Sequence, residues 1–155
     1  LTASSTSPAF SATPGVWTGG FNTDWHNPCN WLNKSLPVTT TTVSIPDTSL
    51  NYCEVLAGNT AVCANLNLND TLKVENPTSS ININGSFTLQ PSGLLDMSTN
   101  STQGGTMSIT GNWFNQRDDS YFIEQGSKVV FNGSAGTQNI QVSGGVSFYC
   151  VSSKQ

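Results

Sequence analysis

The chain has 155 residues, with nine acidic and five basic side chains and one histidine, which give a formal net charge of −4. This length suits a single domain with a reasonable core. Nucleic acids and anionic membranes both require clustered cations, and the sequence has no basic patch, so we expect neither as a partner. No run of about eighteen apolar residues is present, so we expect no insertion into a membrane.

The first fifteen residues, Leu1 to Gly15, are rich in Ser, Thr, Ala and Pro and have no apolar periodicity. Such a composition is typical of a linker or flexible arm. The chain starts at Leu1 without a signal-peptide pattern, as expected for a mature secreted chain or an excised fragment.

Residues 16–47 contain three of the four tryptophans, Trp17, Trp25 and Trp31, within an irregular stretch. We interpret this block as a cap, because the open end of a stacked β-structure exposes apolar core and unpaired strand edges. The alternative is that the three indoles, together with Tyr121, bind carbohydrate by stacking on sugar rings. A cap requires buried indoles, whereas a stacking platform requires at least two exposed ones.

Residues 48–155 show an internal repeat. Ser80–Phe87 and Thr106–Trp113 each alternate two apolar residues with small polar ones and then continue with glycine, a polar residue and an aromatic. A weaker copy follows at Lys128–Ser134. The offsets between the glycines Gly85, Gly111 and Gly133 are 111 − 85 = 26 and 133 − 111 = 22, about the length of one β-solenoid coil.

Period-two alternation recurs along the chain, whereas no convincing helical pattern is present. The expected strand cores are Leu66–Leu68, Leu72–Val74, Ile81–Ile83, Phe87–Leu89, Met107–Ile109 and Val129–Phe131. We therefore predict an all-β fold, a short parallel β-solenoid with a Trp-rich N-terminal cap. The alternative is a β-sandwich, which also has short, regularly spaced strands.

Four cysteines in a chain with little charge indicate an oxidising, extracellular setting. Their spacings do not match a zinc site. Cys150 lies about four coils beyond Cys53 and Cys63, and coils rise by about 4.8 Å each, so it is out of disulfide reach of both. We expect Cys53–Cys63 as the internal bridge, with Cys29–Cys63 next, and Cys150 as a candidate for an intermolecular bond.

The chain has no convincing catalytic site, and we expect no enzyme activity and no cofactor. Its acids are dispersed, and only Asp118 and Asp119 are adjacent. They follow Arg117 in a segment that we interpret as a solvated loop; with Asn115 they form a weak calcium candidate, and we expect no metal. His26 stands alone beside Trp25 and is interpreted as a hydrogen-bonded cap residue.

The Trp-rich block has the motif order Trp-x-Gly, Asp-Trp, Asn-Trp, Pro and Val-x-Ile-Pro, at Trp17–Gly19, Asp24–Trp25, Asn30–Trp31, Pro37 and Val43–Pro46. In this order the block resembles secreted β-helical surface modules of Bacteroidota. Ile109–Trp113 and Val129–Ile140 look like later parts of the same modules. In these bacteria an Asp-Thr/Ser-apolar sequon carries O-linked glycans, and the match at Asp70-Thr71-Leu72 makes Thr71 a candidate, although an ordinary turn explains it as well.

The resemblance and the composition together predict an extracellular structural or adhesive module, such as a stalk or fibre subunit of the cell surface. We expect the C-terminal coil around Val146–Val151 to meet another copy or a neighbouring domain. The alternative function is a carbohydrate-binding module of a secreted protein that acts on polysaccharide.

Overall fold

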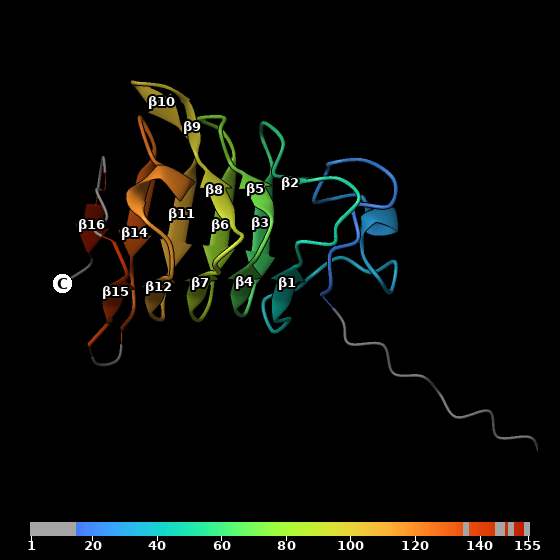
Figure 1. Ribbon diagram of the computed structural model, residues 1–155, viewed down its shortest axis with the longest axis horizontal. Coiled ribbons are helices and arrows are strands. Elements are labelled where there is room, and N and C mark those ends of the chain that lie inside the picture. Colours follow the sequence, from blue (N-terminus) through green and yellow to red (C-terminus); the bar gives the residue numbers. More distant parts are fainter. Residues whose placement is uncertain (1–14, 135–136, 145–147, 149–150, 154–155) are drawn as a thin grey trace, which may run out of the picture.

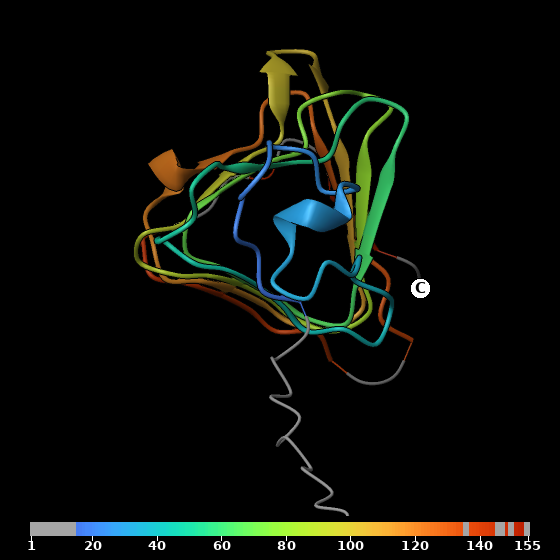
Figure 2. The ribbon, with the colours of Figure 1, turned by 90° about the vertical axis from the view of Figure 1, so that its right-hand side faces the viewer.

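The computed structural model describes residues 15–134, 137–144, 148 and 151–153. In this part of the chain the only helices are two single 3₁₀ turns, η1 (Pro28–Asn30) and η2 (Asp119–Tyr121), and neither is long enough to cross a membrane. The strands wind into a stack of about four coils with a triangular outline (Figures 1 and 2). The predicted all-β solenoid is therefore confirmed.

Three parallel sheets form the walls of the triangle, and the chain visits them in a fixed order. Wall 1 contains β2 (Cys53–Glu54), β5 (Thr71–Lys73), β8 (Leu94–Asp96) and β13 (Phe122–Ile123). Wall 2 contains β3 (Thr60–Cys63), β6 (Ser80–Ile83), β11 (Thr106–Ile109), β14 (Lys128–Phe131) and β16 (Val151–Ser153). Wall 3 contains β1 (Val43–Ile45), β4 (Leu66–Leu68), β7 (Phe87–Leu89), β12 (Trp113–Asn115) and β15 (Ile140–Val142).

The repeat seen in the sequence is the stacking register of wall 2. Ile81 pairs with Met107, which pairs with Val129, so the offsets are 107 − 81 = 26 and 129 − 107 = 22, the same as those of the glycines. All pairings within the three walls are parallel. A sandwich of the kind considered as the alternative is built from antiparallel sheets, so that alternative is wrong.

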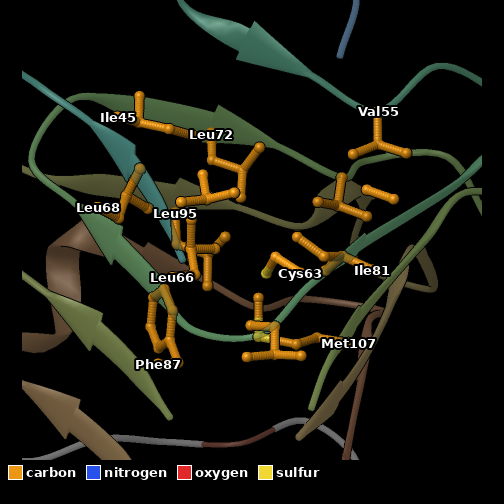
Figure 3. Close-up of a cluster of buried hydrophobic side chains, with 14 of the residues drawn as sticks. Ile45, Val55, Cys63, Leu66, Leu68, Leu72, Ile81, Phe87, Leu95 and Met107 are labelled. Atoms are coloured by element: carbon orange, nitrogen blue, oxygen red, sulfur yellow. The ribbon is translucent and has the colours of Figure 1, made fainter. Parts of the chain in front are cut away.

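The interior of the triangle is one continuous apolar core. Residues such as Leu72 from wall 1, Ile81 from wall 2 and Leu66 from wall 3 point inward and meet at the centre (Figure 3). Each expected strand core places both of its apolar residues in this core, because alternate side chains of a strand face opposite sides. One coil alone would leave these side chains in water, so stacking is what buries them.

The repeated glycine has a packing reason. A Cβ atom on Gly111 would lie 2.5 Å from the carbonyl carbon of Gly85 in the coil below, closer than any real contact. The Gly111 N–H instead donates to the Gly85 carbonyl oxygen at 2.8 Å. The corner between walls 2 and 3 therefore stacks backbone on backbone.

One feature departs from the simple coil. Between β8 and β11, the antiparallel pair β9 (Ser98–Asn100) and β10 (Gln103–Gly104) projects outward from the corner between walls 1 and 2 (Figure 2). The inserted hairpin lengthens this coil, which explains why the step from Ile81 to Met107 is longer than the step from Met107 to Val129.

The first strand of the walls begins within residues 16–47. β1 belongs to wall 3 and pairs with β4, so the first coil strand begins at Val43, inside the range that we assigned to the cap. Nearly all of the arm, residues 1–14, lies outside the described residues.

Candidate functional site

The Trp-rich block lies across the N-terminal end of the stack (Figure 2). Trp17, Trp25 and Trp31 are 0, 1 and 2% exposed, and Trp31 packs edge-on against both others, with ring centroids 5.1 Å from Trp17 and 4.9 Å from Trp25. Two of the indole N–H groups are satisfied inside the cap and first coil, since Trp17 donates to the Asn51 carbonyl and Trp31 to the Trp25 carbonyl, both at 2.8 Å. No indole face is left for a sugar ring.

Backbone hydrogen bonds tie the cap to the first coil. Val16 and Asp24 form isolated parallel bridges with Ser44 and Glu54, on walls 3 and 1. Through these bridges Trp17 N donates to Ser44 O at 2.9 Å, and Trp25 N donates to Glu54 O at 2.9 Å. The cap thus forms an incomplete coil that occupies the strand edges of β1 and β2.

A buried amide that sequence reasoning did not single out organises the cap. Asn30 is 0% exposed, and its Oδ1 accepts hydrogen bonds from the backbone N–H groups of Phe21 and Asn22, each at 2.9 Å. Its Nδ2 donates to Asn22 Oδ1 at 2.6 Å and to Asp24 O at 2.9 Å. The only sequence signal was its position before Trp31, whereas four hydrogen bonds from one side chain make it the polar centre of the cap.

His26 also belongs to the cap. Its Nε2 lies 3.1 Å from the Thr60 carbonyl oxygen on wall 2, and its Nδ1 lies 3.9 Å from an Asp24 carboxylate oxygen. The ring joins the cap to the edge of β3, in line with the expected hydrogen-bonded cap residue.

The opposite end of the stack is built differently. β13, β15 and β16 are the last strands of walls 1, 3 and 2, and among the described residues no segment pairs with their outer edges. Beneath them lies an aromatic cluster in which the Phe148 ring is 5.3 Å from Trp113, 5.7 Å from Phe122 and 5.8 Å from Phe131. Ile140 of β15 is 49% exposed, although its register partner Trp113 is fully buried.

The expected internal disulfides are not formed. Cys29, Cys53 and Cys63 are free thiols, so both Cys53–Cys63 and Cys29–Cys63 are wrong as predictions. Cys53 enters the core from wall 1 and Cys63 from wall 2, whereas Cys29 is exposed in the cap. Burial raises the pKa of Cys63 to about 12 and raises the pKa of Cys53 well above its usual value, which keeps both protonated. Cys150 lies outside the described residues.

Tyr121 and the charged loop before it form a local structural unit. The Arg117 guanidinium lies over the Tyr121 ring at 3.0 Å from the centroid and donates to the Gly93 carbonyl at 2.9 Å. Asp118 caps η2 by accepting a hydrogen bond from Ser120 N at 3.0 Å, and its bonds to Ser120 hold its pKa below the usual value. Arg117 thus occupies one face of Tyr121. Arg117 and Asp118 both have structural partners, Gly93 O and Ser120 N.

Wall 1 carries a row of charges that sequence reasoning missed. Glu54, Lys73 and Asp96 are successive outward register partners, and Lys73 Nζ lies 2.7 Å from Glu75 Oε1 and 3.9 Å from Asp96 Oδ2. Partial burial, with Glu75 beside it, raises the pKa of Asp96. The acids looked dispersed because the sequence offset between neighbours in the row changes from coil to coil, 73 − 54 = 19 and then 96 − 73 = 23.

The sequence offers two further candidate sites, a glycan site at Thr71 and a metal site. Thr71 starts β5 on wall 1, is partly exposed, and its N–H donates to the Asp70 carboxylate at 2.7 Å. A glycan on Thr71 stays a prediction. No group of three or more His, Cys, Asp and Glu side chains suited to a metal ion occurs within the described ranges.

No family model, curated protein or solved structure shows significant similarity to the chain. The resemblance to surface modules of Bacteroidota therefore stays a prediction from its sequence motifs.

Proposed function

We propose that this chain is a non-catalytic structural or adhesive module of the extracellular surface, which assembles end to end through its C-terminal coil. The observation that carries the proposal is the difference between the two ends. A cap covers one end, whereas the outer edges of β13, β15 and β16 have no partner within the described part of the chain.

Unpaired parallel strand edges favour the addition of another strand, because each N–H and C=O group gains a hydrogen bond without rearrangement of the sheet. The exposed Ile140 lies on the edge strand of wall 3, where an added coil would cover it. A stack of coils joined in this way is stiff and resists proteases, which suits a stalk or fibre. The setting outside the cell is supported by the composition and the motif resemblance.

The test compares matched charge insertions at the two ends. We expect the purified chain to form dimers joined at their C-terminal ends, measured by light scattering after size-exclusion chromatography and by negative-stain microscopy. Ile140→Lys should shift the distribution strongly towards monomer, because a cation at the joint would be desolvated without a partner. Leu50→Lys, at a position 78% exposed beside the cap, is the control and should assemble as the unmodified chain does.

A monodisperse monomer at high protein concentration would contradict the proposal. Equal assembly of the unmodified chain and the Ile140→Lys variant would show that any association uses another surface.

A further inference from the structure

The outward face of wall 2 contains a shallow trough that runs across three coils. It has a volume of about 250 Å³ and is lined by Asn82, Ile83, Asn84, Ser108, Thr110 and Asn132. Asn82 and Ser108 are register partners, and Asn84, Thr110 and Asn132 follow their strands one coil apart. The polar groups therefore form a grid, spaced by about 4.8 Å between coils and about 6.6 Å along each strand.

These side chains have no structural task in the described part of the molecule. Asn82, Asn84, Ser108 and Thr110 make no side-chain hydrogen bond to any described residue. Most other asparagines at the corners do: Asn65 Oδ1 accepts from Ser86 N at 2.9 Å, Asn76 Oδ1 from Thr78 N at 3.0 Å and Asn100 Oδ1 from Thr102 N at 2.9 Å. At these corners the asparagine side chains hold turns by hydrogen bonds, whereas in the trough the polar side chains remain available for hydrogen bonds to a ligand.

One atom in the trough lacks a partner altogether. The Oδ1 of Asn132 is shielded from solvent and accepts no hydrogen bond from any described group. An unsatisfied buried acceptor is unfavourable, and a donor from a ligand or from a water molecule would satisfy it. The Asn132 Oδ1 is one of four such atoms among the described residues, with His26 Nδ1, Trp113 Nε1 and Asn115 Nδ2, so it supports a binding site only together with the grid of polar groups.

The chemistry of the trough selects the ligand class. None of its six residues carries a charge, so it has no cation to pair with a phosphate, a sulfate or a carboxylate. Amides and hydroxyls both donate and accept hydrogen bonds, as do the hydroxyl groups of a sugar. Val62 and Val130 continue the row of Asn82 and Ser108 at its two ends and add apolar contacts for the C–H faces of sugar rings.

We propose that this trough is a binding site for a neutral oligosaccharide or polysaccharide chain lying along the solenoid axis. The two coil steps between β6 and β14 span about 10 Å, which favours a segment of chain over a single ring. The volume is below the roughly 300 Å³ of an enclosing small-molecule pocket, so the site holds one side of a polymer. The sheet fixes the backbone positions of these groups in advance, which lowers part of the entropic cost of binding.

This site differs from the carbohydrate-contact residues expected from the sequence. Trp17, Trp25 and Trp31 are buried, and Tyr121 is stacked under Arg117 on another part of the molecule. The new site also does not depend on the proposed assembly, because it uses the face of a wall rather than a strand edge.

The test begins with a printed array of neutral oligosaccharides of glucose, mannose, galactose, xylose and N-acetylglucosamine, together with uronic-acid and sulfated ones. We expect binding to a neutral series that does not weaken at high salt. The best oligosaccharide is then titrated by NMR, and the side-chain amide signals of Asn82, Asn84 and Asn132 should shift.

Two variants test the location. Asn82→Ala/Thr110→Ala removes polar groups from two coils and should weaken binding about tenfold, since each net hydrogen bond contributes about 0.5–1.5 kcal/mol. Ser108→Trp fills the trough and should abolish binding. Asn67→Ala is the matched control, because Asn67 is an outward asparagine in the middle of a wall 3 strand, and it should bind as the unmodified chain does.

Three results would overturn this inference: no neutral glycan bound on the array, equal affinity of the double variant and the unmodified chain, or salt-sensitive binding to acidic glycans only. Thermal unfolding of each variant verifies that the fold is intact. The elution volume of each variant shows whether assembly has changed, so failure of the glycan site and failure of the assembly proposal are told apart.

Discussion

Each end of a solenoid leaves apolar core and strand edges to be covered, and the two ends of this one differ in how they are covered. At the N-terminal end, three indoles and a buried amide close the core, and the cap backbone pairs with the edges of β1 and β2. At the other end, aromatic rings fill the last coil from within, and Ile140 stays half exposed on an edge strand. The cap therefore covers the strand edges at its end, whereas at the other end no described segment pairs with the outer edge strands.

The largest expected effect is the loss of the central indole of the cap. Trp31→Ala should lower the free energy of unfolding by about 3–5 kcal/mol, because it removes a fully buried ring that packs against both Trp17 and Trp25. Chemical denaturation measures the change. Ile140→Ala at the other end should cost less than about 1 kcal/mol, since that side chain is half exposed. Equal losses of unfolding free energy in Trp31→Ala and Ile140→Ala would contradict the difference between the two ends.

Removal of the buried amide should come next. Asn30→Ala leaves the N–H groups of Phe21 and Asn22 without their acceptor and should cost about 3 kcal/mol in the same measurement. Asn27→Ala is the matched control within the block. Asn27 Oδ1 accepts one hydrogen bond, from Cys29 N at 3.0 Å, so its loss should cost about 1 kcal/mol. If both variants lose the same stability, Asn30 does not organise the cap.

Thiol reactivity distinguishes the surface of the cap from the core beneath it. With native protein and a maleimide, followed by peptide mass mapping, we expect rapid modification of Cys29 and protection of Cys53 and Cys63. Burial shields these two, and their raised pKa values keep the reactive thiolate scarce. Recovery of a Cys53–Cys63 disulfide peptide from the native protein would contradict the structure.

Much of the fold could be predicted, because local patterns determine it. Ile81, Ile83, Met107 and Ile109 alternate with small polar residues, and the spacing of the repeated glycines is the register of wall 2. The Trp-rich block was readable as a cap, since large rings in irregular chain suit the closure of an open end.

The surfaces were harder to predict, because they depend on which residues of different coils become neighbours. The charged row of Glu54, Lys73 and Asp96 and the trough of wall 2 both arise from register across coils of unequal length. The cysteine prediction failed for a related reason: Cys53 and Cys63 are close in sequence, but a corner of the coil turns them onto different walls.

The smallest expected effect compares Asp96 on wall 1 with Asp118 in the loop near the open end. Partial burial raises the pKa of Asp96, so the folded chain binds its proton more tightly than the unfolded chain does. Its contribution to stability is full below the ordinary carboxyl pKa and is lost as pH rises through the raised value. Asp96→Asn should therefore raise stability at neutral pH, by less than about 1 kcal/mol because solvent screens the site.

Asp118 should behave with the opposite sign. Its pKa is lowered by hydrogen bonds from Ser120, so its contribution is present above the ordinary carboxyl pKa and disappears as pH falls through the lowered value. Asp118→Asn should lower stability slightly at neutral pH and leave it unchanged in strong acid. Thermal unfolding of both variants between neutral and acidic pH measures how the stability of each variant changes with pH. If both variants change stability at neutral pH in the same direction relative to the unmodified chain, burial on wall 1 does not set the protonation of Asp96.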